Sequence, residues 1–188
     1  MHTIDEPVHI VEYDRTWPAQ FSTECARIAT ALNIDPQGIA HIGSTAVPNL
    51  AAKPTVDIML GVSKWPPPNS LGGDIVRLGY ESLGEAGVPE RLYFRRRDSG
   101  NFNLHVVRLD GNHWRSNIAL RDYLRDNPSA RERYAKAKRA AIASGAESLL
   151  KYSEAKSVVV SDLLQEAFAH QNASLSARDV DDRSMSDT

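Results

Sequence analysis

The feature that most constrains this chain is an apolar segment, TVDIMLGV (residues 55–62), which carries a single charge at Asp57. Because apolar residues occupy both alternating sets of positions, the segment predicts a central strand that is buried on both faces of a sheet. A charge inside such a strand is costly unless it is paired or binds a metal ion. Asp57 therefore indicates either a paired structural acid or a functional site.

A second predicted strand, over residues 39–42, ends directly in Gly43-Ser44. Glycine lets the backbone approach a phosphate closely, and the serine hydroxyl and nearby amides can donate hydrogen bonds to it. An acid on the neighbouring strand can hold Mg²⁺, which in turn bridges nucleotide phosphates. The pair of strands thus favours a phosphate-binding site over the structural alternative, a turn followed by a satisfied buried acid.

The remaining pattern predicts a mixed sheet flanked by helices, with a helical C-terminal part, in the α/β (α+β) class. Apolar residues recur at helical spacing from Phe21 to Leu32, and Cys25 on that face is expected in the core. Further strands are predicted over 91–97 and 102–109, and further helices over 71–78, 114–126, 129–144 and 147–170. We expect one domain over residues 5–171 and a disordered acidic tail over 172–188.

Composition excludes several classes of protein. The single cysteine excludes an internal disulfide and a multi-cysteine zinc site. No apolar run approaches the ~20 residues that a membrane helix needs, and the first residues lack the pattern of a signal peptide. We therefore expect a cytoplasmic protein with no membrane partner.

The charge is unevenly distributed along the chain, although the formal net charge is only −2. Residues 91–139 carry 13 basic and 5 acidic side chains. This segment indicates either an anionic ligand or ordinary solvated helix surfaces, and charge alone does not separate the two.

The segment HIGSTAVPNLAAKPTVDIML (residues 41–60) closely resembles the signature of the GrpB family, a group within the nucleotidyltransferase superfamily. Further matching segments are RLYFR from Arg91, NLHVV from Asn103, LRDYLR from Leu120, and Tyr134 with Lys138. The resemblance implies the polymerase-β-like fold, in which a Gly-Ser loop grips a triphosphate and acids on adjacent strands bind Mg²⁺.

Under this resemblance, Gly43 and Ser44 match the loop and Asp57 matches the first acid. The usual second acid is replaced by Met59. Paired acids hold the two ions of a two-metal transfer, so this departure leaves open a single ion, another ligand, or no transfer. His105, inside an apolar strand, is the candidate to complete the site as a metal ligand or base, the alternative being a hydrogen-bonded core histidine.

Basic side chains supply the other candidates for nucleotide binding. Arg91 and Arg95 share a strand face, and arginine offers phosphate two directed hydrogen bonds. Lys53 can reach a phosphate or lie on the surface, and Thr45 follows the Gly-Ser pair. His41 is expected either to orient the loop or to be a core histidine.

Three functions follow from these residues. The first is Mg²⁺-dependent transfer of a nucleoside monophosphate from a nucleoside triphosphate to an unknown small acceptor, with Asp57 and His105 as metal and catalytic residues. The second is a catalytically inactive module that binds a nucleotide or coenzyme; similar sequences occur fused to dephospho-CoA kinase. The third, nucleic-acid binding, is not expected, because the net charge is near neutral and no aromatic-basic RNA-recognition motif is present.

Overall fold

The computed structural model describes residues 4–185, with side chains as far as residue 173. It contains a mixed sheet of five strands in the order β1-β2-β5-β4-β3. The central strands β2 (Val56–Val62) and β5 (Phe102–Arg108) are parallel, and β1 (Ile39–Ile42), β4 (Arg91–Arg96) and β3 (Glu81–Ser82) join them antiparallel. The predicted fold class and the central position of the segment around Asp57 are confirmed.

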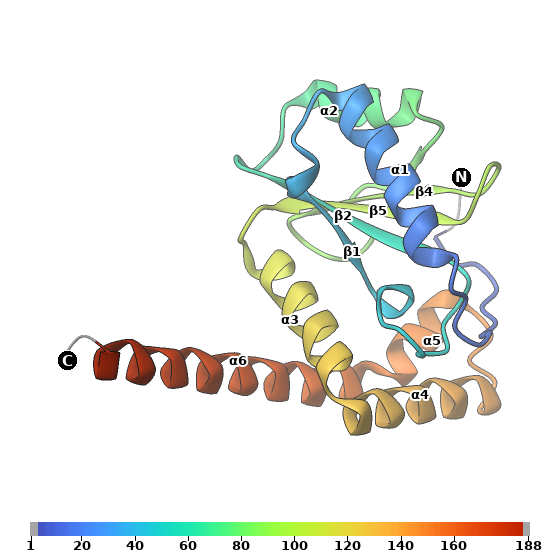
Figure 1. The fold of residues 1–188 in the computed structure, drawn as a ribbon. Coiled ribbons are helices and arrows are strands. Elements are labelled where there is room, and N and C mark those ends of the chain that lie inside the picture. Colours follow the sequence, from blue (N-terminus) through green and yellow to red (C-terminus); the bar gives the residue numbers. More distant parts are fainter. Residues whose placement is uncertain (1–3, 186–188) are drawn as a thin grey trace.

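One face of the sheet is covered by α1 (Trp17–Leu32) and α2 (Asn69–Arg77), which lie above it in Figure 1. Cys25 and Ile28 of α1 pack there against Ile58 and Leu60 of β2, in the largest apolar cluster. Cys25 is a free, buried thiol, as the helical spacing predicts. This face is closed core and holds no part of the site.

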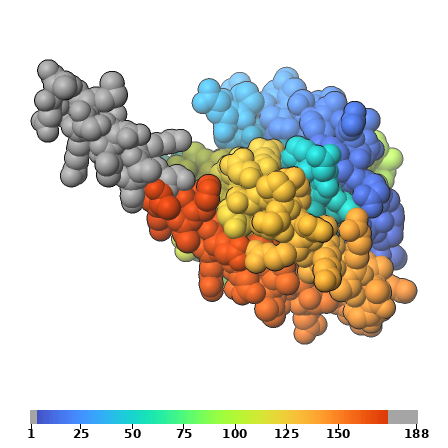
Figure 2. Space-filling model, turned by 60° about the horizontal axis from the view of Figure 1, so that its bottom comes forward, coloured from blue at the N-terminus to red at the C-terminus, as the bar shows by residue number. Residues whose placement is uncertain are grey.

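The opposite face is covered by α3 (Asn112–Asp126), whose Trp114 and Ile118 pack against Met59 and Val107. The chain continues into α4 (Pro128–Ala143), α5 (Leu149–Ala155) and α6 (Ser157–Met185). Figure 1 shows these helices as a layer beside the sheet, and Figure 2 shows their packed outer face, coloured yellow to red. Along the described residues, no helix is both long and apolar enough to cross a membrane.

The single helix predicted over 147–170 is wrong, because the chain breaks at Lys156 into α5 and α6. Tyr152 of α5 packs in a cluster with Val8, whereas Leu163 of α6 packs in a different cluster with Tyr134. The break allows α5 and α6 to pack into two different apolar clusters. The short edge strand β3 was not predicted.

The expected domain boundaries at residues 5 and 171 stay predictions. The backbone of α6 continues to Met185, and residues 186–188 of the expected disordered tail lie outside the described residues.

Strand register places the site at one end of the sheet. Ile42, the last residue of β1, pairs with Asp57 near the start of β2, so the turn after β1 begins beside the carboxylate. Asp57 pairs in parallel with Asn103 of β5, and Met59 pairs with His105. Because side chains alternate along a strand and paired residues share a face, the side chains of two pairs face the same side of the sheet: Asp57 with Asn103, and Met59 with His105.

Candidate functional site

The carboxylate of Asp57 lies at the centre of the candidate site. Its Oδ1 atom accepts a hydrogen bond from Nδ2 of Asn103 at 2.6 Å. Its Oδ2 atom lies against Gly43, at the turn after β1. Although burial raises the pKa of Asp57, the charge of Lys53 and the contacts of His105 and Asn103 hold it well below its usual range. Asp57 is therefore an anion across the physiological pH range.

A chain of polar contacts fixes the orientation of this carboxylate. The amide oxygen of Asn103 accepts a hydrogen bond from Nη2 of Arg97 at 2.8 Å, so its amide nitrogen is the group that faces Asp57. Arg97 is held in turn by the carboxylate of Glu6, with a shortest N–O distance of 2.8 Å. The N-terminal segment thereby helps to position Asp57 through two intermediate side chains.

His105 faces the same carboxylate, with Nε2 at 3.5 Å from Oδ1 of Asp57. Burial lowers the pKa of His105, and the opposing effect of Asp57 does not restore it. The imidazole is therefore neutral at pH 7 and can accept a proton. Its ring also contacts Tyr93, at a centroid distance of 5.0 Å.

The turn that follows β1 is held in place by contacts from side chains that do not line the cavity. His41 lies stacked on Phe21 at 4.8 Å, and its Nε2 is 3.0 Å from the hydroxyl of Thr45 in the turn. Arg121 donates to the carbonyl of His41, and Arg125 donates to the carbonyl of Ala46. The expected role of His41 in orienting the loop agrees with these contacts.

Arg121 and Arg125 thus hold both ends of the turn through its backbone. For these two positions neither alternative for the basic segment holds. The guanidinium groups bind backbone carbonyls, and neither of them lines the cavity beside Asp57.

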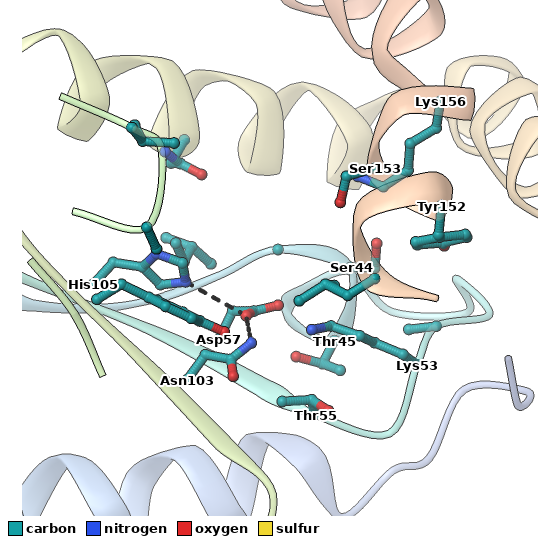
Figure 3. A pocket seen from close by; sticks show the side chains of 18 of the residues that line it. Ser44, Thr45, Lys53, Thr55, Asp57, Asn103, His105, Tyr152, Ser153 and Lys156 are labelled. Atoms are coloured by element: carbon teal, nitrogen blue, oxygen red, sulfur yellow. Dashed lines mark hydrogen bonds and ion pairs between the residues drawn. The ribbon is translucent and has the colours of Figure 1, made fainter. Parts of the chain in front are cut away.

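A cavity of about 430 Å³ opens between the sheet and the C-terminal helices (Figure 3). This volume is in the range of small-molecule sites. Seven of the eight predicted site residues line it: Gly43, Ser44, Thr45, Lys53, Asp57, Arg91 and His105. The structure therefore brings together residues that the sequence separates by up to about sixty positions.

Arg95 is the exception. It lies on the same sheet face as Arg91, but its guanidinium binds Glu81 at 2.7 Å, with Glu6 at 3.7 Å. Arg95 does not line the cavity, and neither does its partner Glu81. Arg96 likewise pairs with the buried Glu24 at 2.6 Å, on the far face of the sheet.

The charge of the cavity favours an anion. Three cationic side chains, Lys53, Arg91 and Lys156, line it with one carboxylate, that of Asp57. The Nε donor of Arg91 is buried, and no hydrogen-bond partner for it lies within the described residues. Its Nη2 atom is held by the carbonyls of Glu85 and Ala86, which fixes the guanidinium in place.

The donor set fits one magnesium ion and not two. The position of the second acid is occupied by Met59, which is fully buried beneath α3. Among the described residues, no three acidic, histidine or cysteine side chains are grouped closely enough to hold a metal. Magnesium commonly uses one or two carboxylates plus substrate phosphates and water, and Asp57 offers one such carboxylate. Oδ2 of Asp57 is the oxygen placed for this role.

The helical wall of the cavity was missed by the sequence analysis. Tyr152 and Ser153 of α5 and Lys156 at the helix break face Ser44 across the cavity (Figure 3). Tyr134 of α4 also lines it. The apolar periodicity of residues 147–170 gives no signal for a break at Lys156, so it predicts one continuous helix. It therefore does not predict that these side chains face the cavity.

Comparisons with known proteins agree on the family. Residues 7–166 match the family described as GrpB protein. A UPF0157 protein of Halalkalibacterium halodurans, BH1888, is 32% identical over 163 residues, covering 86% of this chain and 83% of that protein. A dephospho-CoA kinase of Mycolicibacterium paratuberculosis is 27% identical over 164 residues, covering 72% of this chain and 40% of the kinase.

A solved structure shows the same fold. The crystal structure of the conserved protein GrpB from Enterococcus faecalis superposes with a TM-score of 0.76 at 30% identity, covering 87% of this chain and 99% of that one. The family match spans most of the chain, and its boundaries enclose both strands and helices that form the cavity. This chain therefore belongs to the GrpB (UPF0157) family.

Proposed function

We propose that this protein transfers a nucleoside monophosphate from a nucleoside triphosphate to a small acceptor, with one Mg²⁺ held at Asp57. The observation that carries the proposal is the placement of Asp57, whose Oδ2 faces the Gly43-Ser44 turn inside a cavity with excess positive charge. A bound Mg²⁺ would neutralise phosphate charge between the carboxylate and the nucleotide.

The residues of the cavity have separate roles in this reaction. Ser44 and the turn amides bind the terminal phosphates, while Lys53 and Arg91 stabilise the negative charge that develops on them. The acceptor oxygen forms a bond to the α-phosphorus, the bond from that phosphorus to the bridging oxygen breaks, and pyrophosphate leaves. Nε2 of neutral His105 faces the Asp57 carboxylate and donates to it, so Nδ1 is the ring nitrogen that can take the proton of the acceptor hydroxyl. Alternatively, with its hydrogen on Nδ1, His105 would share the metal ion of Asp57 through Nε2.

A second candidate function is binding of a nucleotide or coenzyme without transfer. Two observations favour it: the buried Met59 at the second acid position, and the similarity to part of a dephospho-CoA kinase. Under this alternative the same cavity holds the phosphates, and the chain acts as an accessory module of coenzyme metabolism.

Calorimetric titration with each nucleoside triphosphate, with and without Mg²⁺, tests the shared part of both functions. We expect metal-dependent binding to the wild type and its loss in Asp57→Asn, which keeps the size of the side chain. Asp74→Asn on α2 is the matched control, because Asp74 pairs with exposed Arg77 on the other face of the sheet. Absence of binding to folded wild type would reject the nucleotide site.

Pyrophosphate release then separates the two functions. Nucleotides that bind are incubated with Mg²⁺ and a panel of small hydroxyl, amine and phosphate acceptors. Release that depends on Asp57 and His105 supports transfer. Tight binding without release across the panel supports the accessory module.

A further inference from the structure

Lys138 is a buried lysine that contacts the phosphate-binding turn from behind. It lies on α4 with 1% of its surface exposed, and its amine donates to the carbonyl of Ala51 and to the hydroxyl of Ser44, the latter at 3.2 Å. The amine also lies 4.6 Å from the ring centroid of Tyr134. Within the described residues, no carboxylate forms an ion pair with it. A fully buried cation without an acidic partner is costly and calls for another source of compensation.

The contact with Ser44 has a direct consequence for the cavity. An ammonium group only donates hydrogen bonds, so the Ser44 oxygen accepts from Lys138 and keeps its own hydrogen free to donate elsewhere. Ser44 lines the cavity, whereas Lys138 does not. A protonated Lys138 therefore directs the hydroxyl hydrogen of Ser44 into the cavity. A neutral amine would accept that hydrogen and withdraw the donor.

The surroundings of Lys138 disfavour its charged form in the free protein. Burial lowers its pKa to about 7, and the charges of Lys156 and Arg139 add to this effect. Lys156 faces it from the break between α5 and α6, Tyr134 and Arg139 lie on its own helix, and the turn contributes only the neutral Ser44 and Ala51. A phosphate group beside Ser44 would supply the missing negative charge and favour the ammonium form.

We propose that Lys138 is a positioning residue that presents the Ser44 hydroxyl to a phosphate group of the ligand, and that phosphate binding is coupled to protonation of Lys138. Lys156, which lines the cavity on the same side, adds a second positive charge to this phosphate subsite. The inference rests on the proposed function for the identity of the ligand as a nucleoside triphosphate, but its chemistry requires only an anionic phosphate chain.

Calorimetry at pH 8 in two buffers of different ionisation enthalpy measures the protons taken up on binding. The probes are Mg²⁺ with a nucleoside triphosphate and Mg²⁺ with inorganic tripolyphosphate, both of which are fully ionised at this pH. We expect the wild type to take up ~1 proton per ligand, and its affinity to fall by up to 10-fold per pH unit above pH 7. Because these measurements use the wild type, they do not depend on whether a Lys138 variant folds.

Lys138→Met removes the titrating amine, so we expect proton uptake and the pH dependence to disappear. Lys136→Met on the same helix is the matched control and is expected to behave as the wild type, since Lys136 lines a separate surface groove. A purely structural role for Lys138 would lower affinity without changing the number of protons taken up.

The outcomes separate this proposal from the proposed function. Triphosphate binding without proton uptake, or with uptake that persists in Lys138→Met, overturns the role of Lys138 and leaves nucleotide binding intact. Binding of tripolyphosphate with uptake, but of no nucleotide, supports Lys138 and rejects the nucleotide. Failure of both probes to bind folded wild type overturns both.

Discussion

A Cβ atom placed on Gly43 would lie 2.6 Å from Oδ2 of Asp57, closer than any normal contact between such atoms. Gly43 also has φ = 70° and ψ = −171°, a backbone conformation that is essentially restricted to glycine. The turn can thus approach the carboxylate only because residue 43 has no side chain. The glycine of the Gly-Ser pair is required by Asp57 as well as by any phosphate.

Gly43→Ala tests this close approach. We expect it to lower the free energy of unfolding by about 2 kcal/mol, because it combines a strained φ with a clash, and to abolish nucleotide binding by displacing Asp57. Gly145→Ala is the control, because Gly145 also has positive φ (87°) but has open space around its Cα. It should cost only about 1 kcal/mol in urea unfolding and leave binding unchanged. Equal effects of the two variants on binding would contradict the proposed contact.

Met59 tests whether the second acid position can be restored. Met59→Asp would place a buried carboxylate in the apolar cluster of Ala40, Val107 and Trp114. We expect a loss of about 4 kcal/mol in the free energy of unfolding and no gain in Mg²⁺ affinity.

Met59→Leu, which keeps an apolar side chain of similar volume, should cost less than ~1.5 kcal/mol and retain binding. Denaturant unfolding and Mg²⁺ titration of both variants measure these effects. A stable Met59→Asp protein with tighter Mg²⁺ binding would show that the site still accommodates a second acid.

The central strands and the approach of Gly43 to Asp57 could be predicted because they depend on local patterns. Apolar residues on both faces define β2, and the Gly-Ser pair at the end of β1 is brought beside Asp57 by simple antiparallel pairing. His105 could be selected because a polar residue in an apolar strand requires a partner. The strands needed only periodicity and the cost of burying polar groups, whereas the assignment of His105 to the site also used the family resemblance, in which Met59 stands at the second acid position.

The helical wall of the site and the fate of each arginine could not be predicted. The four arginines at 91 and 95–97 have a similar sequence context but four different sets of partners. Of the four, Arg91 alone lines the cavity. Their partners, Glu6, Glu24 and Glu81, come from segments whose positions depend on the tertiary fold. The sequence singles out Lys138 only through the family resemblance, because a helical periodicity does not reveal which lysine is buried.

Asn103 is expected to act on ligand affinity through Asp57. Asn103→Ala removes the 2.6 Å hydrogen bond to Oδ1, the shortest contact that orients the carboxylate. Loss of such an orienting contact to a metal ligand typically costs 10–100-fold in affinity, so we expect at least ~10-fold weaker Mg²⁺-dependent nucleotide binding.

Asn101→Ala, two residues earlier in the exposed turn before β5, is the matched control and should bind as the wild type does. Calorimetry on both variants gives the comparison. Unchanged affinity in Asn103→Ala would show that Asp57 is held in its binding orientation without Asn103.

His41 is expected to make the protein sensitive to acid. Burial lowers its pKa to about 4, an effect that Asp57 opposes and that Arg125 and Arg121 reinforce. The unfolded chain, with a pKa near 6.5, therefore binds more protons than the folded protein between these values. The stability contributed by neutral His41 is complete above pH 6.5 and is lost as the pH falls towards 4, by up to about 3 kcal/mol.

Urea unfolding of the wild type and of His41→Asn between pH 7 and pH 4.5 measures this contribution. The wild type should lose stability more steeply than the variant over this range, because asparagine does not titrate. His9→Asn, at an exposed position in the N-terminal segment, should follow the wild type. Parallel curves for all three proteins would mean that folding does not lower the pKa of His41, and would contradict burial of its neutral ring as a source of acid sensitivity.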